Sequence, residues 1–259
     1  MRFSKWHALG NAYLLVERAE LEAPLAGAQA SALCDYHTGV GADGVLEVVA
    51  VEGAEAEILI WNPDGSTAEL SGNGARIAAR WLAHRAGVAI VRLRIGPRLL
   101  RAKVEGQEVE IDVGEVEVGW PEVLDVDGEQ IEFTPVDVGN PHAVVRREAD
   151  RDELLRLGPR IERHPRFPQR TNVQLVRPTG PNELAVLVWE RGAGETLASG
   201  SSSVAAASAA ITQGWCGNPA RVHLPGGTLE VELRGTRAHL TGPAVEVCSG
   251  EVAPEFRRF

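Results

Sequence analysis

Two serines stand at equivalent places in the two halves of the chain. Ser71 and Ser199 are 128 positions apart, and each follows a tryptophan, Trp61 or Trp189, by ten positions. A glycine and an alanine-rich run follow each serine, which predicts that each opens a helix. The first amides of a helix have no partner within it and bind anions, such as the carboxylate of an amino acid. A purely structural role as a helix N-cap also explains each serine.

The elements around the two serines repeat as well. The runs 74–83 and 204–211 are predicted helices, and each ends near a glycine, Gly87 or Gly214, which suits the position after a helix. Alternation of apolar and polar residues, typical of strands, precedes and follows both helices. The ranges with this pattern are 45–51, 56–61, 91–95, 99–104 and 109–113 in the first half, and 172–176, 184–189, 221–224, 229–233 and 238–240 in the second.

This repeat predicts two similar domains. The Gly-Asn pairs at 10–11 and 139–140 share nearly the same offset, and the strands of the first half end before position 120. We therefore expect domains over 1–120 and 121–259, each mostly strand with one long helix. Matching special positions suggest one site in the cleft between the domains, although a duplication kept only for folding explains the repeat as well.

The composition excludes several classes of protein. The 259 residues are 44% hydrophobic and 24% charged, which is ordinary for a globular protein, and the net charge of −10 argues against nucleic-acid binding. The N-terminus has no signal-peptide core, and no apolar stretch is long enough to span a membrane, so we expect a cytoplasmic protein. Lys5 and Lys103 are the only lysines, which leaves few candidates for a pyridoxal phosphate Schiff base.

Several further motifs lack the surrounding sequence or the spacing that their usual function requires. The segment 39–44 matches the GxGxxG dinucleotide fingerprint, but a helix-like stretch precedes it and a strand follows it, the reverse of the required order. Cys34, Cys216 and Cys248 lack the spacing of a disulfide framework or a zinc knuckle. The histidines have no metal-ligand spacing, and neither serine lies in a GxSxG elbow. We expect no metal and no cofactor.

Seven further motifs occur in order along the chain, and together they resemble the diaminopimelate epimerase family. The resemblance implies an α+β fold of two pseudo-symmetric domains. Each would be a mostly antiparallel sheet or barrel wrapped around a central helix, with the active site in the interdomain cleft. The motifs lie at 3–11, 39–44, 62–66, 72–76, 139–142, 171–173 and 190–197.

The resemblance also implies an isomerase that inverts an amino-acid α-carbon without a cofactor, with LL- to meso-diaminopimelate as the default reaction. In that family one cysteine thiolate removes the α-proton and a second cysteine returns a proton to the opposite face. Ser71 and Ser199 occupy those two positions here, with His142 and Glu190 implied to set the protonation of the pair. The implied substrate-binding residues are Asn11, Asn62, Gly72, Asn73, Asn140, Asn172, Glu190, Arg191, Gly200 and Ser201.

Serine changes the chemistry at both positions. A thiol has a pKa near 8.5 that a helix start lowers, whereas an alcohol stays protonated in the same place. Each pKa unit costs about 1.4 kcal/mol, so serine is a poor base for an α-C–H bond.

Three explanations are open. The chain is an epimerase inactivated by replacement of its cysteines, a divergent isomerase or dehydratase of the same fold that uses His142 and Glu190, or a non-catalytic amino-acid-binding protein. The unusual stretch 200–204 favours natural divergence. The expected partner is a small amino-acid substrate, with no nucleic acid and no membrane. Assembly as a homodimer is left open.

Overall fold

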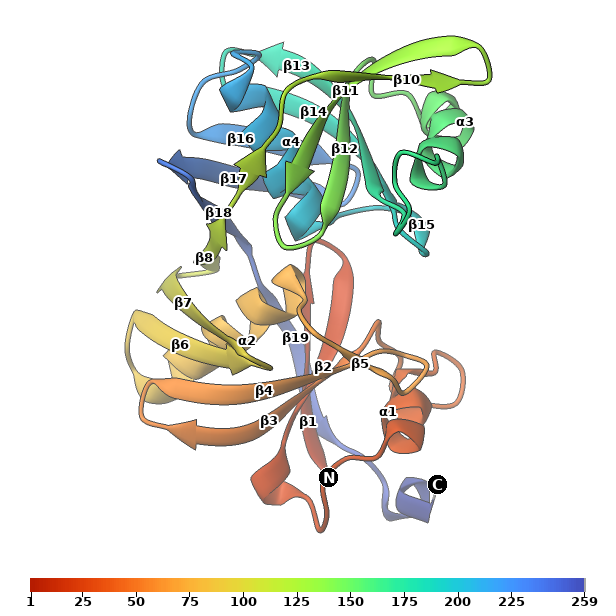
Figure 1. Cartoon of the computed structure of the whole chain (residues 1–259). Coiled ribbons are helices and arrows are strands. Elements are labelled where there is room, and N and C mark those ends of the chain that lie inside the picture. Colours follow the sequence, from red (N-terminus) through yellow and green to blue (C-terminus); the bar gives the residue numbers. More distant parts are fainter. Residues whose placement is uncertain (259) are drawn as a thin grey trace. The chain divides into compact units, whose positions relative to one another are not determined.

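The computed structural model describes residues 1–258, except for the side chains of 257 and 258, and the chain separates into two compact units (Figure 1). The first unit contains residues 1–111 and the segment from Gly242 onward, and the second contains 112–241. This division differs from the predicted boundary near 120. The reason is that strand β19 (Val245–Glu251) pairs with strand β1 (Arg2–Ala8), which returns the end of the chain to the first unit.

The first unit is a mixed sheet with two helices. Strand β2 runs parallel to β3, and β4 runs parallel to β6, while β1–β2, β3–β4, β4–β5, β6–β7 and β7–β8 are antiparallel. Its further elements are β2 (Asn11–Glu17), η1 (Arg18–Glu20), α1 (Gly27–Cys34), β3 (Val45–Glu52), β4 (Glu55–Trp61), β5 (Thr67–Ala68), α2 (Gly72–Ala86), β6 (Ile90–Ile95), β7 (Arg98–Glu105), β8 (Glu108–Glu115) and η2 (Pro254–Arg258).

The second unit repeats this topology. Strand β12 runs parallel to β13 and β14 runs parallel to β16, as β2–β3 and β4–β6 do in the first unit. The internal repeat read from the sequence is therefore a repeat of strand order. Its elements are β9 (Glu117–Val118), β10 (Glu122–Val126), β11 (Glu129–Asp137), β12 (Pro141–Arg146), α3 (Arg151–Glu162), β13 (Asn172–Gly180), β14 (Glu183–Glu190), β15 (Gly194–Thr196), α4 (Gly200–Thr212), β16 (Ala220–Leu224), β17 (Gly227–Arg234) and β18 (Arg237–Pro243).

A helix that opens at each serine forms the core of each unit. Helix α2 packs against β1, β2, β4, β6 and β7, and it ends before Gly87, whose φ of 66° is left-handed as a residue after a helix requires. Helix α4 packs against β9, β11–β14, β16 and β17. Its alanines are fully buried, because side chains of this size let the strands approach closely. Both predicted helices, and an α+β fold made mostly of sheet, are confirmed.

The sequence pattern predicts one long helix in each half and does not predict helix α3. Its side chains Leu154, Leu157 and Ile161 are buried at helical spacing, and Asp150 caps its first turn by accepting a bond from Glu153 N at 3.0 Å. In chain order it takes the place that α1 has in the first unit.

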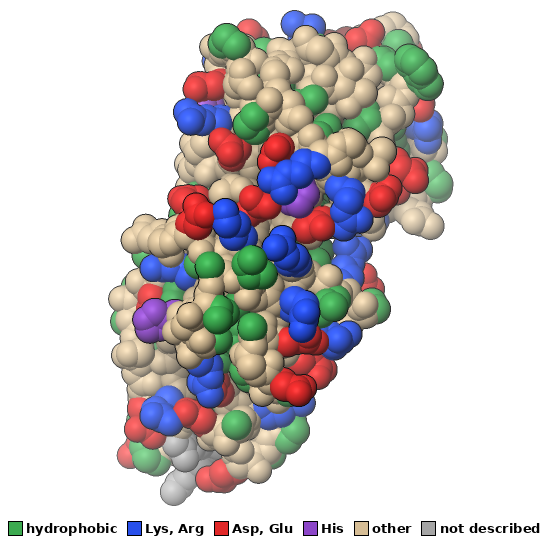
Figure 2. Space-filling view, turned by 90° about the vertical axis from the view of Figure 1, so that its left-hand side faces the viewer, with side chains coloured by type: hydrophobic (Ala, Val, Ile, Leu, Met, Phe, Trp, Pro, Cys, Tyr) green, Lys and Arg blue, Asp and Glu red, His purple; other side chains and the backbone are tan. Residues whose placement is uncertain are grey.

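Acidic and basic side chains are interspersed on the face that Figure 2 draws. The described residues form many ion pairs, including Arg151 with Glu195 and Arg166 with Glu122, both at 2.8 Å. Exposed pairs of this kind contribute about 0–1 kcal/mol each, so they shape the surface more than they stabilise the fold.

Candidate functional site

Ser71 is the N-cap of helix α2. Its backbone is extended, its Oγ accepts a hydrogen bond from Gly74 N at 3.0 Å, and its carbonyl accepts one from Ala75 N at 2.8 Å. The geometry of a helix start leaves the N–H groups of Gly72 and Asn73 without a carbonyl partner in the helix. Two backbone donors beside one hydroxyl form a place where a carboxylate can bind.

The hydroxyl of Ser71 has an ionisable neighbour. Tyr13, a buried residue of β2, donates from its hydroxyl to Ser71 Oγ at 2.9 Å. Because that oxygen accepts from both Tyr13 and Gly74, the Ser71 hydroxyl hydrogen remains able to donate outward. Asn11 begins the same strand, and its Oδ1 accepts from Asn73 Nδ2 at 3.1 Å. Residues 11, 13 and 71–73 are called the Ser71 cluster below.

Asn62 lies in the turn between β4 and β5. Its Nδ2 donates to Ser66 Oγ at 2.9 Å, and its backbone closes the turn through Ser66 O and Gly65 N. The turn rests on the first residue of α1, where a Cβ at Gly27 would lie 2.5 Å from Gly65 O. Asn62 is thus held in a rigid turn, while the predicted contact with substrate stays a prediction.

Ser199 repeats the position of Ser71 at the start of helix α4. Its Oγ accepts from Ser202 N at 3.4 Å, and its carbonyl accepts from Ser203 N at 3.0 Å and from Ser203 Oγ at 2.7 Å. The N–H groups of Gly200 and Ser201 are left by the helix in the same way. Ser199 is 6% exposed, so its hydroxyl lies in a mostly desolvated place.

The ionisable neighbour of Ser199 is Glu190, at the end of β14. Burial raises the pKa of the Glu190 carboxyl above its ordinary 4.5, and a hydrogen bond with the Ser199 side chain partly opposes that rise. A carboxylate accepts hydrogen bonds, so the Ser199 hydroxyl is the donor. Residues 190 and 199–201 are called the Ser199 cluster below.

His142 on β12 is buried and neutral. Burial lowers its pKa from 6.5 to about 3. Its Nε2 lies 3.0 Å from Asn140 Oδ1, and its Nδ1 lies 2.9 Å from Gln174 Nε2, so the proton is on Nε2 and Nδ1 accepts. Gln174 Nε2 also donates to Ser202 Oγ at 3.0 Å. His142 therefore links Asn140 to the first turn of α4, with both ring nitrogens engaged inside the protein.

Asn172 and Arg191 hold the backbone around Glu190. Asn172 Oδ1 accepts from Arg191 N at 2.9 Å, and its Nδ2 donates to Pro141 O at 3.1 Å, which ties β13 to the start of β12. Arg191 is exposed, and its Nη1 donates to Gln169 O at 3.3 Å. The predicted substrate contacts of Asn172 and Arg191 stay predictions, and the structure adds a positioning role for Asn172.

Buried glutamates hold the two tryptophans that precede the serines. Trp61 Nε1 donates to Glu47 Oε2 at 3.0 Å, and Trp189 Nε1 donates to Glu162 Oε2 at 2.8 Å. Glu162 Oε1 also accepts from Gly192 N at 3.0 Å, so it supports the loop after Glu190 from the other side. The repeated tryptophans are therefore supports for the strand ends that carry the site residues.

Sequence reasoning missed Tyr13 and Gln174. A signal for Tyr13 was present, because it stands 129 positions before His142, the offset that relates Asn11 to Asn140. Gln174 had no such signal, since its partner position in the first half holds a leucine, Leu46. Its role depends on the parallel pairing of β12 with β13, which a sequence pattern does not reveal.

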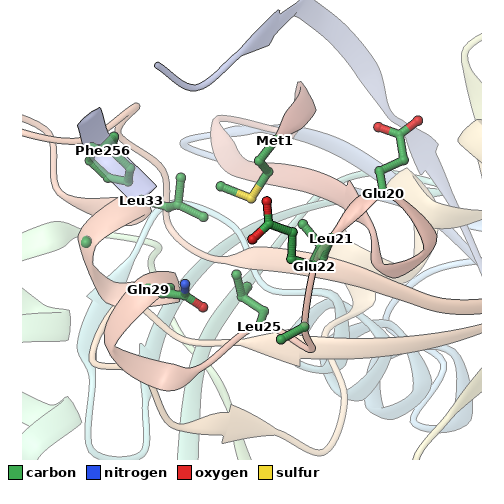
Figure 3. A pocket seen from close by; sticks show the side chains of 10 residues that line it. Met1, Glu20, Leu21, Glu22, Leu25, Gln29, Leu33 and Phe256 are labelled. Carbon is green, nitrogen blue, oxygen red and sulfur yellow. The ribbon is translucent and has the colours of Figure 1, made fainter. Parts of the chain in front are cut away.

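Other features of the described residues lie apart from these clusters. Figure 3 shows a pocket of the first unit whose lining includes no predicted site residue. No helix within residues 1–258 is long and apolar enough to cross a membrane. The same part of the chain holds no group of three His, Cys, Asp or Glu side chains placed to bind a metal ion. The pocket is lined by Met1, Glu20, Leu21, Glu22, Ala23, Leu25, Gln29, Ala32, Leu33 and Phe256.

Comparison with solved structures supports the fold. A probable proline racemase from Agrobacterium radiobacter, with bound carbonate, matches with a TM-score of 0.71 and 15% identity, covering 98% of this chain and 93% of that one. A phenazine biosynthesis protein of the PhzF family from Enterococcus faecalis matches with a TM-score of 0.72 and 13% identity, covering 97% and 98%. At these identities the likeness concerns the fold.

Comparison of sequences gives the family. The diaminopimelate epimerase family model matches residues 3–119 and 134–251. A diaminopimelate epimerase of Stutzerimonas stutzeri is 37% identical, covering 97% of this chain and 99% of that protein, and one of Desulfitobacterium hafniense is 38% identical over 96% and 97%. With nearly full-length matches on both sides and a serine-capped helix in each repeated unit, the chain belongs to the diaminopimelate epimerase family.

Proposed function

We propose that this chain is a diaminopimelate epimerase-like isomerase in which the ionisable neighbours of Ser71 and Ser199 move the protons. The observation that carries this proposal is the pairing of each N-cap serine with one such group, Tyr13 for Ser71 and Glu190 for Ser199. Two alcohols alone supply no base. A carboxylate and a phenol beside them supply a base and an acid.

Glu190 is the base in this proposal. Burial raises the pKa of its carboxyl above the ordinary value, which makes the carboxylate a stronger proton acceptor. The α-C–H bond of the substrate breaks, and its electron pair stays on carbon, delocalised into the α-carboxylate. The proton passes to the Glu190 carboxylate, either directly or through the Ser199 hydroxyl that is hydrogen-bonded to it.

We propose Ser71 as the residue that returns a proton to the α-carbon, the role that the family resemblance implies for its position. Its hydroxyl hydrogen forms the new C–H bond, and the phenol of Tyr13 replaces that hydrogen along the existing 2.9 Å hydrogen bond. Solvent then restores Tyr13 and takes the proton from Glu190, so that atoms and charge balance. The free amides of Gly72 and Asn73, and of Gly200 and Ser201, stabilise the negative charge on the carboxylate.

His142 has a positioning role in this scheme rather than an acid–base role. Its Nε2–H is committed to Asn140, its Nδ1 accepts from Gln174, and its pKa of about 3 keeps it neutral. The divergent reaction that would use His142 as a base is therefore less well supported than one that uses Glu190.

Deuterium wash-in tests the proposal. The wild-type protein in D₂O is expected to exchange the α-hydrogen of LL- or meso-diaminopimelate, followed by ¹H NMR, and Glu190→Gln is expected to abolish the exchange. Glu195→Gln is the matched control, because that carboxylate pairs with exposed Arg151 and not with a serine. Exchange that survives in Glu190→Gln contradicts the role of Glu190. Binding without exchange in the wild type supports the non-catalytic amino-acid-binding alternative.

A second experiment tests the inactivated-epimerase explanation. The double substitution Ser71→Cys with Ser199→Cys places a thiol at each helix start, where its pKa falls toward neutrality. A large increase in epimerisation of diaminopimelate is expected, because thiolate and thiol then meet the family chemistry. A folded double variant that stays no faster than the wild type refutes the idea that the serines alone limit the rate.

Substrate, location and assembly are further parts of this proposal. We propose diaminopimelate as the substrate, the cytoplasm as the location and a homodimer as the assembly. Wash-in over a panel that includes proline derivatives and basic amino acids tests the substrate. Light scattering at working concentrations tests the assembly, and a monomer at all concentrations excludes the dimer.

A further inference from the structure

Arg76 is a buried cation that forms no salt bridge among the described residues, although the charge of Glu108 acts on it from a longer distance. It lies in the first turns of α2, and its side chain is 0% exposed, which makes it the largest fully buried side chain of the described residues. Its Nη2 donates to Asn73 Oδ1 at 2.7 Å, whereas Nε and Nη1 have no hydrogen-bond partner among the described residues. Burial lowers its pKa to about 10. Such an arrangement costs free energy, so a purely structural reason for it is weak.

The guanidinium determines how the next two side chains are oriented. Arginine has donors and no acceptor, so the atom of Asn73 that faces Arg76 must be its oxygen. The amide nitrogen of Asn73 then faces the other way and donates to Asn11 Oδ1 at 3.1 Å. With its oxygen turned to Asn73, the half-buried Asn11 has an Nδ2–H₂ group that can donate to a ligand.

The second unit ends a similar relay on the equivalent asparagine, Asn140. Gln174 donates to His142 Nδ1, and His142 Nε2–H donates to Asn140 Oδ1, which again leaves an amide nitrogen as the outward group. Neutral groups form that relay, so its direction depends on the histidine tautomer. In the first unit a cation at the origin removes this freedom.

We propose that Arg76 is a positioning residue that fixes the amide orientation of Asn73 and, through it, of Asn11, so that Asn11 meets the substrate as a hydrogen-bond donor. The chemistry that an amide nitrogen recognises is an acceptor, and in an amino acid with two carboxylates that acceptor is a carboxylate oxygen. This inference rests on the proposed function in one respect, namely that the Ser71 cluster contacts the substrate.

A test that needs no ligand comes first. In ¹⁵N-labelled protein the side-chain amide protons of Asn73 are expected to show NOEs to Asn11 and slow exchange with solvent. Arg76→Met, which keeps the volume and removes the donors, is expected to lose both features, while Arg76→Lys keeps them because Nζ can still donate to Oδ1. Unchanged NOEs and exchange in Arg76→Met overturn the proposal, whether or not the protein binds an amino acid.

Binding separates positioning from a structural role. With meso-diaminopimelate in a calorimeter, Arg76→Met is expected to raise Kd about tenfold, with a Tm that is unchanged or higher because an unpaired buried charge is removed. In an Asn11→Ala background the same substitution is expected to leave Kd unchanged. A fall in Tm with no change in Kd indicates a structural residue and refutes the inference. If wild-type protein binds no diaminopimelate the proposed function fails, and the NMR result decides the relay by itself. Should Arg76→Met not fold, Arg76→Gln is measured in its place, with the same expected losses.

Discussion

The buried histidine makes a quantitative prediction about stability and pH. His142 has a folded-state pKa of about 3, against 6.5 for an exposed histidine, because burial disfavours the imidazolium. The unfolded chain therefore binds the proton first as the pH falls. The contribution of His142 to stability is complete above pH 6.5 and is lost progressively between pH 6.5 and pH 3. At pH 5 the loss is about 2 kcal/mol, from 1.36 kcal/mol for each pKa unit.

Urea unfolding followed by tryptophan fluorescence measures this loss. The free energy of unfolding is compared at pH 7.5 and pH 5.0 for the wild type and for His142→Asn, which cannot titrate. The wild type is expected to lose about 2 kcal/mol more than the variant over this interval. His84→Asn, at an exposed position of α2, is the matched control and is expected to behave as the wild type does.

A flat comparison refutes the reasoning. If wild type and His142→Asn lose the same free energy between pH 7.5 and pH 5.0, His142 binds its proton as easily in the folded protein as in the unfolded chain. Its Nδ1 then would not be committed to Gln174, and His142 would return as a candidate acid–base group. The measurement therefore bears on mechanism as well as on stability.

Three further substitutions test the supports of the site. Gly65→Ala places a Cβ on a residue with φ of 82° and against Gly27, so it is expected to cost about 2 kcal/mol or more in urea unfolding, whereas Gly53→Ala at an open turn costs about 1 kcal/mol. Trp61→Phe leaves one oxygen of the buried Glu47 carboxylate without its donor and is expected to cost about 1–3 kcal/mol by the same assay. Glu162→Gln replaces one of two acceptors that hold the 189–192 segment, and hydrogen exchange is expected to show faster exchange at the amide of residue 192.

Much of the fold could be predicted because its signals are local. A serine or glycine at a helix end acts through its own backbone geometry, so Ser71, Ser199 and Gly87 gave both helix starts and one helix end correctly. Strands with alternating apolar and polar residues, such as 91–95, could be predicted equally well, because β6 buries every second side chain along its length. The resemblance to a known family predicted the overall α+β fold, and the comparison with solved structures supported that fold.

Helix α3 shows where local reading fails. Its sequence is rich in charged residues and contains Gly158 and Pro159, both of which lower helix propensity. Three apolar side chains at helical spacing and the Asp150 cap outweigh these residues, because burial against β13 and β14 stabilises the helix. The end of the chain was misplaced for a related reason. The pairing of β19 with β1 joins residues about 240 positions apart, and no sequence pattern within either strand predicts it.

The candidate site was predictable in its repeated part and unpredictable in its differences. Ser71 and Ser199 share a backbone position, an N-cap geometry and two free amides in each helix start. The ionisable partner comes from β2 in the first unit and from the end of β14 in the second, so the two partners do not occupy equivalent positions of the repeat. His142, at the position equivalent to Tyr13, turns to Asn140 and Gln174 instead.

This difference bears on how a pair of serines could do work that the family assigns to a pair of cysteines. Two identical alcohols in identical surroundings have the same acidity, and neither is a base near neutrality. Tyr13 donates a hydrogen bond to Ser71, whereas Glu190 accepts one from Ser199, so in the proposed mechanism Ser71 gives a proton and Ser199 passes one on. Divergence of the neighbours therefore supplies an asymmetry that identical serines lack. Two cysteines can form a thiol and thiolate pair without such help, whereas two serines cannot. Any proton transfer in this chain is therefore expected to depend on Tyr13 and Glu190 rather than on the serines themselves.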